Sequence, residues 1–133
     1  MNKMIRKIGP TEHQIQCAIV EWANNTNFGS EKIGDYLIAI PNGGNRSITE
    51  AVRLKKEGVK SGVSDIFLAI SVMKDYRVYG GLWIEVKTKK GKLSPAQKNW
   101  MEKMNRNDYK ADVVRSLDEG IQAIKNYLDE LIF

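Results

Sequence analysis

Three polar side chains interrupt an apolar stretch in the middle of the chain. Asp65 opens the apolar run Ile66–Val72, and Glu85 and Lys87 lie at the end of a second run, Leu82–Val86. Successive side chains of a strand alternate between its two faces, so Glu85 and Lys87 are expected to share one face. Carboxylates are ligands for hard divalent cations, and a lysine can neutralise a phosphate. These residue types therefore predict a site for a metal ion and a phosphate group.

The two apolar runs are expected to bring these residues together. Each run has the length and composition of a buried strand, and a polar connection separates them. In an antiparallel hairpin, pairing Asp65 with Glu85 or with Lys87 places the turn near Asp75 or Tyr76, inside that connection. Either register brings the three charged residues to one end of the sheet. A salt bridge at a sheet edge is the alternative, but burying these charges without a function would be costly.

The same residues match a known arrangement. Asp65 followed by Glu85-Val86-Lys87 resembles the D…E-x-K signature of the PD-(D/E)XK nuclease superfamily. Ser64 stands where that signature usually has a proline, a departure that leaves the acidic residues and the lysine intact.

Longer blocks around this signature resemble one family of the superfamily, the VRR-NUC family. The blocks are NGGNR at 42–46, GVKSGVSD at 58–65, GLWIEVK at 81–87 and GKLSPAQ at 91–97. The resemblance runs from about Thr11 to Tyr127. It implies that Asp65, Glu85 and the backbone carbonyl of Val86 hold Mg²⁺, with Mn²⁺ able to substitute. It also implies that Lys87 is catalytic.

The first helix carries a further acidic candidate. Thr11 and Gln14 form a capping-box pattern that predicts a helix starting here, and Glu12 and Gln16 lie on one edge of its apolar stripe. Superfamily nucleases often place an acid on this helix beside the metal. The resemblance thus implies Glu12 as a catalytic residue and metal ligand, and Gln16 as a DNA contact. The alternative for Glu12 is a favourable charge at a helix N-terminus.

Gln97 has two possible roles. Ser94-Pro95 predicts a helix start, and Gln97 falls in its first turn. The resemblance directs the Gln97 side chain toward the active site, as a catalytic residue. A reciprocal capping bond to Ser94 is the alternative, and one side chain can do both.

Basic and amide residues near the signature are candidate DNA contacts. Lys89, Lys90 and Lys92 follow it in a segment without acids, which favours phosphate positioning. A solubilising cluster is the alternative. In the family the turn after the first strand borders the active site, which makes Asn42 and Arg46 candidates for DNA contacts. An ordinary structural turn is the alternative for both.

The composition limits the possible classes. The chain has 133 residues, of which 42% are hydrophobic and 28% are charged, as expected for one globular domain spanning 1–133. Residues 1–9 are expected to form a flexible arm. No apolar run approaches the roughly 20 residues that span a bilayer, so a cytoplasmic protein without membrane contact is expected. The single cysteine excludes an internal disulfide and a Cys-based zinc site, and the single histidine excludes HNH-type or zinc-hydrolase chemistry that needs several histidines. The net charge of +5 suits a polyanionic partner.

The pattern of helices and strands predicts an α/β protein in the order α-β-α-β-β-α-β-α. Helices are expected to start near Thr11, Ser47, Ser94 and Ser116. Strands are expected at 36–40, 66–72, 82–86 and 109–114, with 24–35 as a loop. The resemblance implies a restriction-endonuclease-like core, a mixed sheet of about four strands flanked by helices.

The sequence therefore predicts a Mg²⁺-dependent DNA endonuclease. Small members of the family resemble Holliday-junction resolvases, which implies branched DNA as substrate and a homodimer that cuts two strands. A bacterial or phage-infected cell is the expected setting. Two alternatives stay open, namely a sequence-specific restriction enzyme and a non-catalytic DNA-binding module.

Overall fold

A mixed four-stranded sheet is the centre of the fold in the computed structural model, which describes residues 8–41 and 46–129. The strands of this sheet are β3 (Leu37–Ala39), β4 (Ile66–Leu68), β7 (Leu82–Val86) and β8 (Lys110–Val114). The helices are α2 (Glu12–Asn24), α3 (Ile48–Lys56), α4 (Pro95–Arg106) and α5 (Leu117–Leu128). The predicted α/β class with a mixed sheet is confirmed.

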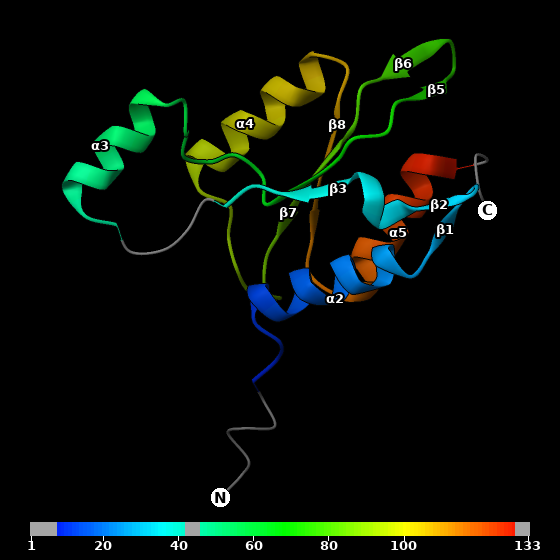
Figure 1. Ribbon diagram of the computed structural model, residues 1–133, viewed down its shortest axis with the longest axis horizontal. Coiled ribbons are helices and arrows are strands. Elements are labelled where there is room, and N and C mark those ends of the chain that lie inside the picture. The colour runs from blue at the N-terminus through cyan, green and yellow to red at the C-terminus, as the bar shows by residue number, and fades with distance from the viewer. Residues whose placement is uncertain (1–7, 42–45, 130–133) are drawn as a thin grey trace, which may run out of the picture.

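The sheet has helices on both sides. Strand β4 pairs antiparallel with β3 on one side and with β7 on the other, and β8 runs parallel to β7 at the edge. In Figure 1, α4 lies above the sheet, whereas α2 and α5 lie below it. Residues such as Ile84 of β7, Ile19 of α2 and Ile124 of α5 are fully buried in one core cluster. On the alternate positions of β7, Trp83 meets Trp100 of α4 edge to face, with 5.2 Å between ring centroids.

The predicted helix starts are confirmed by their capping bonds. The Thr11 hydroxyl accepts the Gln14 N–H at 3.1 Å, and the Gln14 side chain accepts the Thr11 N–H at 2.9 Å. Ser47 and Ser116 cap α3 and α5 through their hydroxyl groups. These side chains satisfy backbone donors that a helix leaves unpaired at its first turn. The capping residues in the sequence thus mark where these helices start.

The central hairpin has one of the two predicted registers but not the predicted strand length. Ile66 pairs with Ile84, a register that continues to Asp65 opposite Glu85. The expected strand 66–72 is wrong, because β4 ends at Leu68 and a separate hairpin of β5 (Val72–Lys74) and β6 (Arg77–Tyr79) follows. Ala69, Ile70 and Ser71 separate β4 from β5, whereas only Gly80 and Gly81 separate β6 from β7. The extra residue on one side interrupts the ladder.

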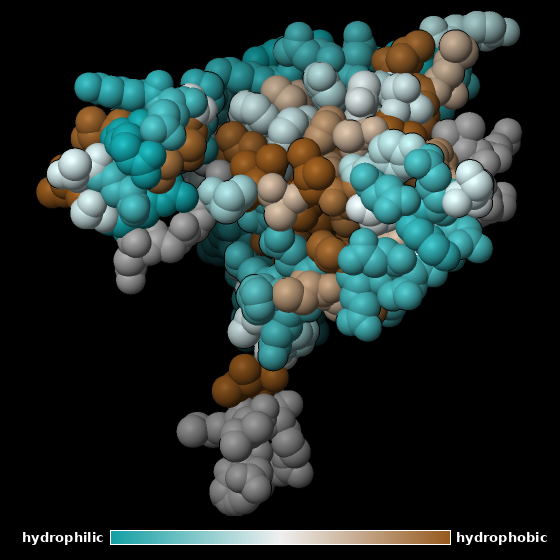
Figure 2. Space-filling view, in the orientation of Figure 1, coloured by the Kyte–Doolittle hydropathy of each residue, from teal (hydrophilic) through white to brown (hydrophobic). Residues whose placement is uncertain are grey.

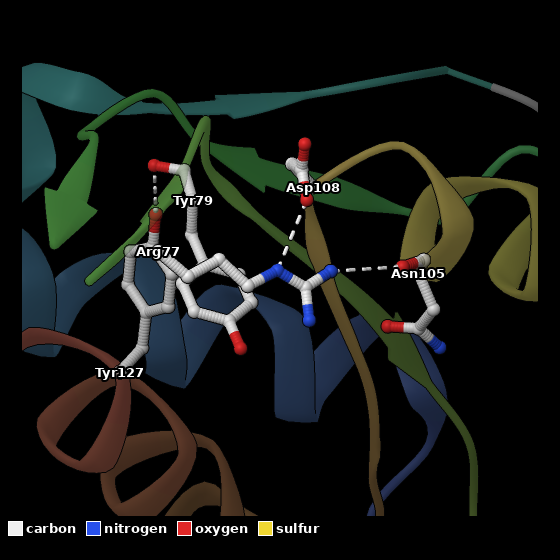
Figure 3. Close-up of polar contacts among 5 residues, drawn as sticks. All are labelled: Arg77, Tyr79, Asn105, Asp108 and Tyr127. Carbon is white, nitrogen blue, oxygen red and sulfur yellow. Dashed lines mark hydrogen bonds and ion pairs between the residues drawn. The ribbon is translucent and has the colours of Figure 1, made fainter. Parts of the chain in front are cut away.

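Side-chain contacts hold the β5–β6 hairpin against the rest of the domain. Its turn residues Asp75 and Tyr76 both have positive φ angles, as two-residue hairpin turns of this hand require. Arg77 pairs with Asp108 at 3.0 Å and donates to the Asn105 carbonyl at 3.4 Å, and its guanidinium lies over the Tyr79 ring (Figure 3). The Tyr127 hydroxyl of α5 donates to the Tyr79 carbonyl from the other side (Figure 3).

The segment 24–35 is not the plain loop that was expected. It contains a short hairpin of β1 (Asn27–Phe28) and β2 (Glu31–Lys32), followed by the 3-10 helix η1 (Ile33–Tyr36). Ile33 is fully buried, so this segment closes one end of the core. Among the described residues, no helix has the length and apolar character needed to cross a membrane.

Candidate active site

Asp65 and Glu85 meet where β4 begins and β7 ends. The Asp65 carboxylate accepts the N–H of Val86 at 2.7 Å, and the Asp65 carbonyl accepts the N–H of Ile40 at 2.8 Å. Asp65 therefore joins the end of β7 to the residue that follows β3. Its side chain is held on β7 beside Glu85, which is the arrangement that the hairpin register predicts.

Gln97 fixes the orientation of Glu85. Its Oε1 atom accepts the N–H of Ser94 at 2.8 Å, and its Nε2 atom donates to Oε2 of Glu85 at 3.3 Å. Because the capping bond occupies the amide oxygen, the amide nitrogen is the group left to face the carboxylate. Gln97 therefore both caps α4 and contacts the Glu85 carboxylate, the two possibilities that the sequence left open.

The segment before Asp65 lies tightly against the start of α4. Gly62 has a φ of +87°, and a Cβ atom placed on it would lie 2.6 Å from the Ala96 carbonyl oxygen. Only glycine accommodates both the backbone angle and the close approach. The loop that leads to Asp65 and the helix that carries Gln97 are thereby held together.

The carboxyl group of Glu85 is buried and strongly perturbed. Only 2% of the residue is exposed. Burial is the main reason why the pKa of Glu85 is raised from 4.5 to about 8, and a hydrogen bond with Asp65 and the charge of Asp65 add to the effect. Lys87 lowers the pKa of Glu85 and Glu12 raises it. In the absence of a metal, this raised pKa favours the protonated form of Glu85 near neutral pH.

Lys87 lies directly after β7 and is also buried, with 9% of its surface exposed. Its backbone N–H donates to the Val114 carbonyl at 3.0 Å, so the main chain at Lys87 is held beside β8. Lys87 is the cation that acts on Glu85 in this structure. Buried ions of this kind are functional candidates, because folding alone does not reward them.

The structure does not bring Glu12 and Gln16 into this cluster. Glu12 is exposed at the start of α2 and is close enough to act on Glu85 only through its charge. Gln16 is half-buried and lines a shallow hollow on α2 together with His13 and Cys17. Within the described ranges, no group of three His, Cys, Asp or Glu side chains is arranged to hold a metal ion. A three-carboxylate metal cluster that includes Glu12 is therefore not preformed.

The remaining carboxylates still suit a hard cation. With both carboxyl groups ionised, Oε1 of Glu85 is buried and has no hydrogen-bond partner among the described residues. Such an orphaned oxygen costs free energy unless a proton or a cation neutralises it. Mg²⁺ needs only one or two carboxylates, because it keeps several waters. Asp65 and Glu85, with the carbonyl of Val86 directly after Glu85 in sequence, therefore fit a Mg²⁺ ion.

Comparison with known proteins agrees with this geometry. The sequence profile of the VRR-NUC domain matches residues 1–118. The chain belongs to the VRR-NUC domain family. A solved structure described as a VRR_NUC domain protein is 30% identical and superposes with a TM-score of 0.78, covering 91% of this chain and 90% of that one. No curated protein matches the sequence. Membership of this family implies a nuclease-type function that acts on DNA.

The candidate DNA contacts of this VRR-NUC domain fall in different places. Lys89 and Lys90 form an exposed turn shortly after β7, and Lys92 is exposed just beyond it. Arg46 is half-buried, and its guanidinium donates to the Pro41 carbonyl at 3.4 Å. Asn42 lies outside the described residues.

Arg115 is a residue that the sequence interpretation missed. It follows β8, and its guanidinium nitrogen Nη1 donates to the carbonyls of Thr88, Lys89 and Gly91 at 2.8, 3.3 and 2.7 Å. It is half-buried, so these charge-assisted bonds are partly shielded from water. Arg115 therefore holds the lysine turn of the VRR-NUC domain in one conformation. No local pattern marks it, because its partners lie more than twenty residues away.

Replacing Arg115 with alanine is expected to release this turn. Losing hydrogen bonds from a charged donor should lower the free energy of unfolding by about 1–3 kcal/mol. The KM for DNA should rise several-fold while kcat changes little, because Asp65 and Glu85 are not touched. Thermal unfolding and steady-state cleavage measure the two effects. Arg106→Ala removes the same charge from the exposed end of α4 and is the matched control. An unchanged KM in Arg115→Ala would contradict this role.

Proposed function

We propose that this VRR-NUC domain is a Mg²⁺-dependent DNA endonuclease that hydrolyses phosphodiester bonds, selectively in branched DNA. One observation carries the proposal: the buried Glu85 carboxylate, with an unpartnered oxygen, interacts with both Asp65 and Lys87. Apolar packing can stabilise a fold without a buried carboxylate, so stability alone does not account for Glu85. Hydrolysis of a phosphodiester needs both a hard-cation site and a nearby positive charge.

Each residue of the cluster has a distinct task in this proposal. Asp65 and Glu85, with the Val86 carbonyl, hold the cation, and Mn²⁺ is expected to substitute for Mg²⁺. When bound, the cation polarises the phosphate and lowers the pKa of a water. Lys87 orients the attacking water and neutralises the charge that develops on the phosphate. Gln97 keeps Glu85 in its orientation through the 3.3 Å hydrogen bond.

The outer residues bind and position the substrate. Lys89, Lys90 and Lys92 contact backbone phosphates, since point charges on a turn carry no base information. Arg46 and Gln16 are assigned to DNA contacts at the borders of the site. Glu12 acts on the carboxylate pair from outside it, through its charge and through solvent. The site acts in the cytoplasm of a bacterial or phage-infected cell.

Branched DNA and a homodimer are proposed together. A single small domain offers little surface for reading base sequence, whereas two copies related by a two-fold axis would present one site to each of two strands. Light scattering of the protein mixed with an uncleaved four-way junction measures this directly. A monomer bound to the junction would contradict the dimer.

Cleavage of matched substrates tests the activity itself. Labelled four-way junction and linear duplex of the same sequence are incubated with purified protein in Mg²⁺, Mn²⁺ or EDTA, with Glu85→Ala as the control. We expect junction cleavage in both metals, and none in EDTA or in the control. Equal cutting of both substrates would remove the selectivity and keep the nuclease. Cutting at one short sequence would indicate a restriction-type enzyme, and binding without cutting would indicate a DNA-binding module.

A further inference from the structure

Helix α3 is not part of the buried core. None of its residues is buried, and Ile48 and Val52 are 85% and 50% exposed. It stands apart from the sheet at the left of Figure 1. Figure 2 shows it as a projection with hydrophilic and hydrophobic residues intermixed. Packing of an apolar face normally stabilises a helix of this length. Because α3 buries no residue, packing against the core does not explain which side chains it carries.

The end of α3 folds the following chain back against the helix. The N–H of Val59 donates to the Leu54 carbonyl at 3.0 Å, and the N–H of Gly58 donates to the Lys55 carbonyl at 3.1 Å. Gly58 has a φ of +99°, and these bonds form the Schellman arrangement of a helix C-terminus. The last carbonyls are therefore satisfied by the backbone, and the lysines of α3 are not needed to cap it.

This fold-back creates a basic cleft of about 530 Å³. Arg46, Lys55 and Lys60 line it, over a floor that includes Leu54 and Val59. No acidic side chain is among the described residues that line it.

The nearest acids leave the charges of the cleft unneutralised. Glu57 pairs instead with Arg53 at 2.9 Å, and Glu50 lies in the first turn of α3, away from the lining. Lys55 and Lys60 are exposed and take part in no ion pair within the described part of the chain. Three converging cations without a counter-charge form a site for an anion.

The cleft lies close to the carboxylate pair along the chain. Lys60 and Asp65 are five residues apart, so their Cα atoms are at most about 18 Å apart. The loop between them is held against α4 at Gly62. A B-DNA strand rises about 3.4 Å per nucleotide, so the cleft is within about five nucleotides of a phosphate bound at Asp65.

We propose that this cleft, henceforth the α3 cleft, binds the sugar-phosphate backbone of the DNA within about five nucleotides of the cut. The inference rests on the proposed nuclease function and adds a second contact that neither the signature nor the lysine turn supplies. Lys55, Lys60 and Arg46 neutralise the phosphates, while Leu54 and Val59 meet the apolar faces of the sugars. Backbone contacts of this kind fix register without reading sequence.

A double substitution, Lys55→Ala with Lys60→Ala, tests the α3 cleft. Binding of a fluorescent four-way junction is measured in EDTA at salt concentrations from about 50 to 200 mM. Each lost phosphate contact lowers the slope of log affinity against log salt by about 0.9, so a reduction of about two is expected. In Mg²⁺, the KM should rise on the order of tenfold, with kcat unchanged. Lys32→Ala, on β2 at the opposite side of Figure 1, is the matched control.

A shortened substrate supplies a second, independent readout. Trimming the junction arms to fewer than about five base pairs beyond the cut should weaken binding of the wild type. The trimming should add little to the effect of the double substitution, because both remove the same contact.

The outcomes separate this proposal from the nuclease itself. A wild-type salt slope in the double variant, or full additivity with trimming, would overturn the α3 cleft and leave the nuclease intact. A wild-type protein that binds the junction in neither EDTA nor Mg²⁺ would overturn both. Loss of kcat at saturating DNA would also overturn the assignment, because the α3 cleft is a binding surface and not part of the carboxylate cluster.

Discussion

Lys87→Ala is expected to lower cleavage at saturating DNA by on the order of 100- to 1,000-fold, the usual cost of removing one electrostatic catalytic group. Binding of DNA should change little, because Lys87 is buried and the exposed lysines supply the long-range attraction. Lys87 also lowers the pKa of Glu85, so its loss should move the remaining activity to higher pH.

Three measurements distinguish this effect from a loss of folding. Thermal unfolding reports the stability of Lys87→Ala, junction binding in EDTA reports its affinity, and single-turnover cleavage reports the chemical step. Lys89→Ala removes the same charge type two residues later and should raise KM while kcat stays near that of the wild type. Cleavage by Lys87→Ala at the wild-type rate would sink the catalytic assignment.

Glu85→Gln is expected to flatten the dependence of stability on pH and to abolish metal-dependent cleavage. In the metal-free wild type, the pKa of Glu85 is raised from 4.5 to about 8 by burial, so the folded protein holds a proton that the unfolded chain releases. The resulting stabilisation is fully present below pH 4.5 and is lost as the pH rises through about 8. Glutamine is neutral at every pH and close in volume, so the variant should lack this decline.

Mg²⁺ supplies the second half of this test. Because the cation competes with the proton for Glu85, added Mg²⁺ should raise the melting temperature of the wild type most strongly at alkaline pH. It should leave that of Glu85→Gln unchanged. Melting curves at several pH values, with and without Mg²⁺, measure both effects. An identical pH dependence in the two proteins would mean that Glu85 is not the titrating group.

The parts of the site that could be predicted are those set by local patterns. The apolar runs around Asp65 and Glu85 and the polar turn between them limit the hairpin to two registers, because a slip of one residue would expose the buried face. Ser94, Pro95 and Gln97 similarly encode both a helix start and the amide that reaches Glu85.

The parts that could not be predicted depend on contacts between distant segments. Arg115 meets the lysine turn only because β8 lies parallel to β7, and an isolated arginine after a strand carries no signal of that. The distance between Glu12 and Asp65 depends on how α2 crosses the sheet, which helical periodicity does not specify. The break after Leu68 depends on one additional residue in a connection, and apolar character continues across it to Val72.

That break has a consequence for how the domain can vary. The β5–β6 hairpin has its own strand ladder and its own side-chain contacts with α5 and with the α4–β8 turn. Its tip at Asp75 and Tyr76 is therefore structurally independent of the strand that carries Glu85. Insertions are best tolerated at exposed tips of this kind. The hairpin tip is therefore the natural position for an epitope, a fluorophore or an added targeting module that leaves the chemistry of the domain unchanged.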